Sequence, residues 1–207
     1  MERVRQFFSA ILAGMLIGMG GTVFLSQSNP VVGSFLFAIG LFTIVVFQLH
    51  LFTGKVGYTP FNKPVYLIEL VVTWLGNLVG TWITATMVRN SRIYEGMAER
   101  VAGMAEVKLS DDFTSIFLLA VFCGMLMFIA VDCFRNVQGS TLRFIGVFVP
   151  VMVFILSGFE HVIANIFYFS LSGTWSAHCF VAVLVMTLGN AVGGMLIPIY
   201  LKVFKQR

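Results

Sequence analysis

Six long apolar segments divide the chain, and each is long enough to cross a lipid bilayer. A hydrocarbon core about 30 Å thick is spanned by about 20 predominantly apolar helical residues. Hydrophobic residues make up 58% of the chain and charged residues 11%, against about 45–50% and about 25% in a soluble domain. The segments lie at about 7–25, 31–52, 65–88, 113–132, 144–169 and 180–203. The sequence therefore predicts an all-α integral membrane protein with one transmembrane domain over residues 1–207.

The distribution of positive charge predicts how these segments are oriented. Cytoplasmic loops of membrane proteins carry an excess of Lys and Arg. With the N-terminus inside, nine of the 13 basic residues fall on the inner side: Arg3, Arg5, Lys55, Lys63, Arg135, Arg143, Lys202, Lys205 and Arg207. The other four, Arg89, Arg92, Arg100 and Lys108, fall in one long polar loop at 89–112. We expect a multi-pass protein of the cell inner (plasma) membrane with both termini cytoplasmic. The sequence contains no basic run with interleaved aromatic residues, so nucleic-acid binding is not expected.

Short sequence motifs from the first half of the chain recur in the second half, at a nearly constant offset in residue number. A-G-M-L at 13–16 returns as C-G-M-L at 123–126, and L-G-N-L-V-G at 75–80 returns as L-G-N-A-V-G at 188–193. We interpret residues of about 7–88 and about 113–203 as two copies of one three-helix unit. Because three spans is an odd number, the two copies insert with opposite topology, as two inverted repeats.

Inverted repeats of this kind place a solute site near the bilayer midplane, where interrupted helices from the two halves meet. We expect the second and fifth helices to be interrupted at 51–54 and 158–165, where small and polar residues follow an apolar half-span. Backbone N–H groups freed at such a break favour an anion. Thr53 and His161 then point toward the same central place.

Glu160 and His161 are an ionisable pair at membrane depth, which by default indicates a functional site. The alternative is that His161 only hydrogen-bonds a neighbouring helix. Adjacent residues on a helix do not face each other, so we interpret Glu160 as holding the broken backbone rather than as an acid–base partner. Asn77 and Asn190 either hydrogen-bond the broken segments or line the pathway.

Four motifs carry a family resemblance: F-E-H-V-I-A-N at 159–165, L-F-T-G at 51–54 and the two L-G-N-x-V-G motifs. In these motifs the chain resembles the formate/nitrite transporter family, which includes formate, nitrite and hydrosulfide channels. The resemblance covers nearly the whole chain. It implies an aquaporin-like six-helix bundle, assembled as a homopentamer with one pore in each subunit.

The resemblance also implies roles for individual residues. A central histidine, His161, faces Thr53, while Lys108 lies near the outer vestibule and Asn190 lies on the sixth helix. Apolar constrictions on either side of the histidine fall on Phe37, Leu41, Leu51, Phe52, Met127 and Phe154. His50 departs from the family pattern, because many relatives have Glu there. Either this second histidine alters proton handling and anion preference, or it is a hydrogen-bonded structural residue.

We therefore expect a channel or transporter for a small monovalent weak-acid anion of the formate, nitrite or hydrosulfide class. A bare charge at the bilayer centre costs several kcal/mol. His161, with an unperturbed pKa of ~6.5, would hydrogen-bond the anion or give it a proton. The sequence does not identify the anion. It also leaves open whether transport is channel-like or proton-coupled, and whether the N-terminus gates the pore.

The alternative is a pore for a neutral solute such as water or ammonia on the same fold, although the aquaporin Asn-Pro-Ala pairs are absent. An enzyme is not expected, because H-E-x-x-H, G-x-S-x-G and clustered carboxylate pairs are absent. The cysteines Cys123, Cys133 and Cys179 lack metal-ligand spacing. We expect no metal and no cofactor.

Overall fold

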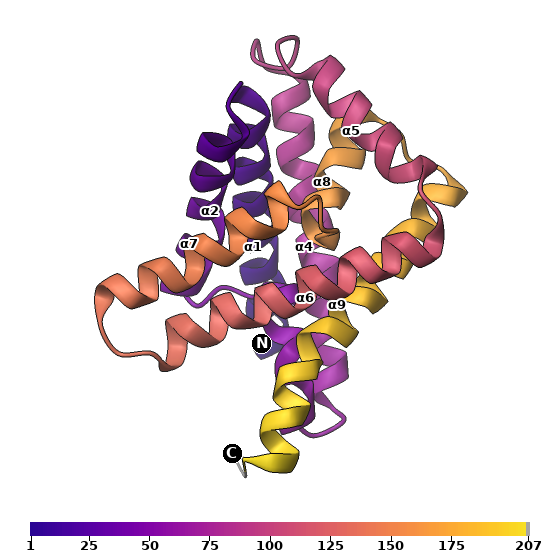
Figure 1. Cartoon of the computed structure of the whole chain (residues 1–207). Helices are drawn as coiled ribbons and strands as arrows, with labels where there is room; N and C mark the ends of the chain where they lie inside the picture. The colour runs from indigo at the N-terminus through magenta and orange to yellow at the C-terminus, as the bar shows by residue number, and fades with distance from the viewer. Residues whose placement is uncertain (206–207) are drawn as a thin grey trace.

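The computed structural model describes residues 1–205, and these form helices without a β-strand (Figure 1). Arg207, counted above with the inner charges, lies outside the described residues. In chain order the elements are α1 (Glu2–Ser26), α2 (Pro30–Val46), α3 (Phe52–Lys55), the 3₁₀ helix η1 (Val56–Phe61), α4 (Tyr66–Arg89), α5 (Ala98–Ser110), α6 (Phe113–Asn136), α7 (Ser140–Leu156), α8 (Val162–Ser172) and α9 (Ala177–Phe204).

Four helices, α1, α4, α6 and α9, are long and apolar enough to cross a membrane, and α2, α7 and α8 are shorter apolar helices. The segment predicted at 31–52 is the helix α2 followed by a break, and the segment predicted at 144–169 is divided between α7 and α8. The expected positions of the divisions need correction. The first lies at 47–51 rather than 51–54, and the second lies at 157–161, because residues 162–165 already form the first turn of α8.

Both breaks begin with the same helix-ending motif. Leu49 and Phe159 each donate a backbone N–H to the carbonyl five residues earlier, at 2.9 Å, and Gln48 and Gly158 each donate to the carbonyl three residues earlier. Gln48 and Gly158 have left-handed backbones, with φ of 54° and 70°. This pair of hydrogen bonds around a left-handed residue is the Schellman motif. Each break is thus a formed turn that satisfies the last carbonyls of its helix.

Two pairs of long helices, α1 with α4 and α6 with α9, approach each other very closely at glycines. A Cβ added to Gly14 of α1 would lie 2.3 Å from the carbonyl oxygen of Asn77, and one added to Gly124 of α6 would lie 2.3 Å from that of Asn190. Small residues allow helix backbones in membranes to pack at such distances. The packing brings Asn77 and Asn190 next to the two breaks.

The stretch 89–112, expected as a polar loop, contains the helix α5 and packs against α8, as the upper right of Figure 1 shows. Arg100 of α5 donates to the carbonyl oxygens of Leu25, at 3.1 Å, and of Gln27, and its guanidinium carbon lies 4.8 Å from the Phe24 ring centroid. Arg100 therefore fastens α5 to the end of α1. α8 lies beneath it in the interior, with every residue from Val162 to Leu171 buried.

Candidate functional site

His161 is the N-cap residue of α8, and its ring is almost completely buried, with 1% of its surface exposed. Its Nδ1 atom accepts the backbone N–H of Ala164 at 3.1 Å, and its Nε2 atom lies 2.9 Å from Oγ1 of Thr53. A backbone N–H can only donate, so Nδ1 carries no hydrogen and the neutral ring has its hydrogen on Nε2. The Nε2–H group therefore donates to the Thr53 hydroxyl.

Thr53 lies in α3, directly after the first break, and is also 1% exposed. Its hydroxyl oxygen accepts from His161, and this is its one side-chain hydrogen bond among residues 1–205. The hydroxyl hydrogen thus remains free to donate. The two predicted central residues, separated by 108 positions in the chain, meet as a directly bonded pair.

Asn77 of α4 holds the first break in place. Its Oδ1 atom accepts the backbone N–H of Phe52 at 2.8 Å, and its Nδ2 atom donates to the carbonyls of His50 at 2.9 Å and Ala10 at 2.8 Å. Both amide hydrogens are therefore used within the protein. The chain on either side of Leu51 is fixed to α4 and α1.

Asn190 of α9 makes the corresponding bonds at the second break. Its Oδ1 atom accepts from the backbone N–H of Val162 at 2.9 Å, and its Nδ2 atom donates to the carbonyls of Glu160 and Ala120, both at 2.8 Å. The side chain is 0% exposed. Asn190 was expected either to hydrogen-bond the broken segment or to line the pathway. Its geometry favours the first, because both amide hydrogens are used within the protein and none is left for a solute.

The six residues expected to form constrictions are all buried and belong to the hydrophobic core: Phe37, Leu41, Leu51, Phe52, Met127 and Phe154. Phe154 stacks on the His161 ring, with centroids 5.4 Å apart and planes at 23°. Phe37 meets Phe154 edge to face at 6.0 Å. One face of the His161 ring is thus covered by an aromatic side chain, and both members of the pair are buried, where a polar contact is stronger than in water.

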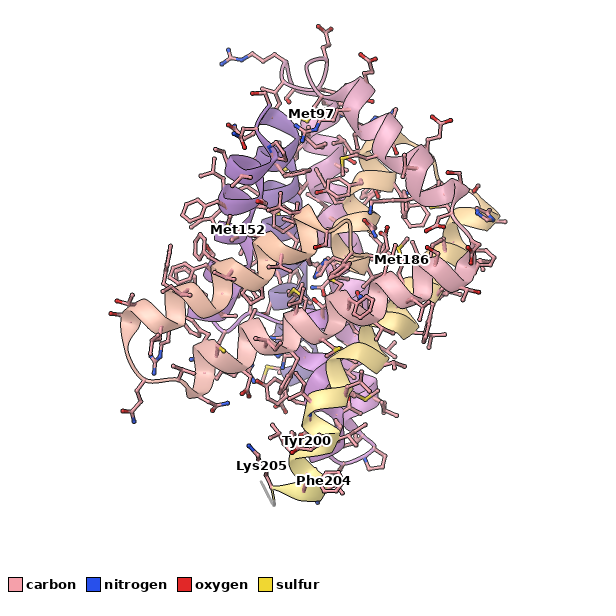
Figure 2. The ribbon with its side chains drawn as sticks, in the orientation of Figure 1. Met97, Met152, Met186, Tyr200, Phe204 and Lys205 are labelled. Atoms are coloured by element: carbon pink, nitrogen blue, oxygen red, sulfur yellow. The ribbon has the colours of Figure 1, made fainter. Side chains whose placement is uncertain are left out.

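A cavity of about 430 Å³ leads from α5 to His161, with Glu160, Lys108 and Asn165 in its wall. The Nζ atom of Lys108 lies 2.7 Å from Oε2 of Glu160, the same oxygen that accepts from Asn165. Met186 of α9, labelled in Figure 2, adjoins this group, with its sulfur 3.2 Å from Asn165 Nδ2. Lys108 is thus half of an ion pair, and that pair ties α5 to the second break.

His50 lies at the first break, half-buried and outside this group. Its Nδ1 atom lies 3.0 Å from Oγ of Ser9, and the Ser9 oxygen accepts the backbone N–H of His50 at 3.2 Å. The tautomer of His50 decides which of the two side chains donates the hydrogen between Nδ1 and Oγ. Ser9 has no signal in the sequence that would have identified it, whereas Asn165 belongs to the F-E-H-V-I-A-N motif.

Known proteins resemble this chain over most of its length. Residues 1–204 match the family model described as "Formate/nitrite transporter". The nitrite transporter NirC of Salmonella typhimurium is 27% identical over 212 residues, covering 90% of this chain and 78% of that protein. The formate channel BtFdhC of Bacillus thuringiensis is 28% identical over 180 residues, covering 79% and 68%.

Two solved structures share the fold. An "FNT family ion channel" has a TM-score of 0.83 at 24% identity and covers 94% of this chain and 87% of its own. A "pentameric formate channel with formate bound" has a TM-score of 0.83 at 22% identity and covers 100% and 98%. Because the family model spans almost the entire sequence, this chain belongs to the formate/nitrite transporter family.

Proposed function

We propose that this chain is the subunit of a membrane channel for a small monovalent weak-acid anion of the formate, nitrite or hydrosulfide class. The observation that carries the proposal is the cavity that reaches His161, whose buried ring is hydrogen-bonded to Thr53 on its Nε2 side. The relatives are named as formate channels and nitrite transporters, which supports the same class of solute. As channels and transporters they also support a non-enzymatic role.

The pair offers two hydrogens to an entering anion. The Thr53 hydroxyl hydrogen is free, and the Nε2–H of His161 becomes available when the anion replaces the Thr53 oxygen as its acceptor. Hydrogen bonds to an ionised acceptor are about twice as strong as neutral ones. An anion with two adjacent acceptor atoms, such as formate or nitrite, would receive both hydrogens at once.

The first turn of α8 favours hydrogen-bond donation by His161 over proton donation. To give up a proton and remain neutral, the ring must first carry hydrogens on both nitrogens. A hydrogen on Nδ1 would face the N–H of Ala164 and break the cap of α8. In the proposed mechanism His161 therefore stays neutral, and any proton that accompanies the anion is supplied from elsewhere.

The proposal includes the architecture predicted from the repeats. The matched bonds of Asn77 and Asn190, and the Schellman turns at Gln48 and Gly158, support an aquaporin-like bundle of two inverted three-helix repeats in one domain. The pentameric neighbour supports a homopentamer, and the charge distribution supports cytoplasmic termini. Anion attraction by Lys108, expected from the sequence, is weakened in this proposal because Glu160 neutralises the lysine.

The test is flux of formate, nitrite and hydrosulfide into proteoliposomes at two pH values. We would compare the native protein with His161→Asn, which keeps an oxygen able to cap α8, and with His178→Asn as the control. His178 is exposed and bonds the carbonyl of Leu109, far from the pair in sequence and outside the cavity wall. We expect His161→Asn to lose anion flux and His178→Asn to keep it. Unchanged flux in His161→Asn would overturn the role given to His161.

A pore for a neutral solute is the second candidate, favoured by the apolar Phe154 ring that stacks on the His161 imidazole. Osmotic swelling of the same vesicles separates the two functions. If water or ammonia enters while no anion moves at either pH, the neutral pore replaces the anion channel.

A further inference from the structure

A recess lined by two arginines lies between the end of α2, the end of α6 and the start of α7, near the α6–α7 turn at the left of Figure 1. Its volume is about 390 Å³. We call it the arginine recess; its walls are Val45, Val46, Gln48, Phe134, Arg135 and Arg143. It is separate from the cavity that reaches His161, with which it shares no residue.

The two arginines of the recess form no ion pair within the described part of the chain, and the Arg135 guanidinium carbon lies 4.7 Å from the Tyr58 ring centroid. Within residues 1–205 the one ion pair shorter than 4.0 Å is that of Lys108 with Glu160, so neither arginine has a carboxylate partner. Arg143 uses its Nε–H on the carbonyl of Val137 at 2.8 Å, which leaves its other donors free. Asp132, one turn before Arg135, accepts from Tyr58 and Asn136 and is not part of the recess wall.

The recess continues into an aromatic groove on the surface between α2, α6 and α7. This groove, of about 600 Å³, shares Val46, Phe134 and Arg143 with the recess and extends to Phe42 and Phe144. Val46 is 44% exposed and Phe144 is 39% exposed. Exposed apolar side chains on a membrane helix are suited to contact lipid chains. A charged recess and an apolar groove thus lie end to end on one face.

We propose that this face binds an anionic phospholipid, with its phosphate between Arg135 and Arg143 and an acyl chain along the aromatic groove. The arginine fork matches phosphate oxygens in pairs. Basic pockets between membrane helices on the cytoplasmic side are suited to anionic headgroups, and the charge distribution assigns both arginines to that side.

The bound lipid would also contact the first break. Gln48 lines the recess and is the left-handed residue of the Schellman turn that ends α2. His50 follows two residues later, and Asn77 holds its carbonyl next to α3 and Thr53. A headgroup in the recess therefore braces the segment that positions half of the central pair.

The test compares Arg135→Gln/Arg143→Gln with the native protein in neutral detergent. Phosphatidylglycerol, phosphatidylcholine or inorganic phosphate is added, and lipid retention is read by native mass spectrometry and thermal stability by a melting scan. We expect phosphatidylglycerol to bind and to raise Tm more than phosphatidylcholine does. A basic side chain contributes about fivefold to such binding, so the double variant should bind about 25-fold more weakly. Arg143→Gln alone changes an exposed position and should bind phosphatidylglycerol about fivefold more weakly. This single variant keeps the test valid if the double variant misfolds.

The matched control is Arg3→Gln/Arg5→Gln, which removes two exposed charges from the same predicted side. Its affinity for phosphatidylglycerol should stay within about twofold of that of the native protein. Equal losses in both double variants would mean attraction by net charge, without a site. Stabilisation by inorganic phosphate alone would mean a free-anion site, and release of single subunits by the recess variant would mean a subunit contact. Each of these three results overturns the proposal.

Discussion

Asn77 and Asn190 make the same set of three hydrogen bonds in opposite halves of the protein. Each accepts a backbone N–H from the residue that starts a helix after a break, and donates to the carbonyl just before that helix and to a carbonyl on an adjacent long helix. Both side chains are 0% exposed. One N–H and one C=O freed at each break are thus satisfied by a buried amide, as membrane depth requires.

Asn190→Ala should therefore destabilise the protein strongly. Three hydrogen bonds of about 1 kcal/mol each are lost, and the N–H of Val162 is left buried without this partner. We expect a loss of about 3 kcal/mol in unfolding free energy, measured by denaturant titration in detergent. Asn90→Ala is the control, because Asn90 is exposed and makes one bond to its own helix. Equal effects of the two variants would contradict the role of Asn190.

Gln48 and Gly158 occupy equivalent left-handed positions, but only one of them is glycine. A left-handed backbone costs a side-chain-bearing residue about 1–2 kcal/mol, partly offset by the entropy that glycine loses on folding. Gln48→Gly should thus stabilise the protein by about 1 kcal/mol, and Gly158→Gln should destabilise it by about as much.

Melting curves in detergent without anionic lipid would test this reciprocal pair. A Cβ at Gly158 meets nothing within 4 Å, so the backbone dominates the difference. Shifts of the same sign for the two substitutions would show that packing, not φ, governs these turns.

The positions of the breaks show what sequence reasoning located and what it missed. Gly158 is a strong turn signal, and the second break was predicted to within a residue at its start. Gln48 carries no such signal, because its left-handed conformation follows from the Schellman bonds rather than from its residue type. α5 did leave a signal: Val101 and Ala105 are its buried positions, spaced one turn apart as in an amphipathic helix.

The candidate site was predictable where the two repeats could be aligned. The expectation that Thr53 and His161 lie at one place came from the repeat and the resemblance, and the structure bonds the two residues directly. The partners of Lys108 and His50 were not predictable, because Glu160 lies 52 residues from Lys108 and Ser9 lies 41 residues from His50. Such contacts depend on which helix faces cross, and composition carries no information about that.

Lys108→Met should cost far more stability than the loss of an exposed lysine. The side chains of Lys108 and Glu160 are 13% and 5% exposed, so the variant leaves a buried carboxylate without its cation. Breaking a buried pair in this way costs about 3–5 kcal/mol, and the partial exposure of Lys108 puts our expectation at the lower end, about 3 kcal/mol. Denaturant titration would measure this loss.

The double variant Lys108→Met/Glu160→Gln removes both charges, and Gln can still accept from Asn165. Most of the stability lost in Lys108→Met should therefore return. If the double variant is as unstable as Lys108→Met, packing of the lysine stem rather than charge pairing holds α5 against the second break.

Thr53→Val tests the hydroxyl of the central pair, since valine keeps the shape and removes the hydrogen bond. The variant loses one of the two donors to the anion and leaves the Nε2–H of His161 without its acceptor. One hydrogen bond of about 1.4 kcal/mol corresponds to a tenfold change, so anion flux in proteoliposomes should fall about tenfold. Thr53→Ser retains the hydroxyl and should keep flux within about threefold of the native protein. If Thr53→Val and Thr53→Ser conduct equally well, His161 alone contacts the anion, and Thr53 serves only to orient the imidazole ring at rest.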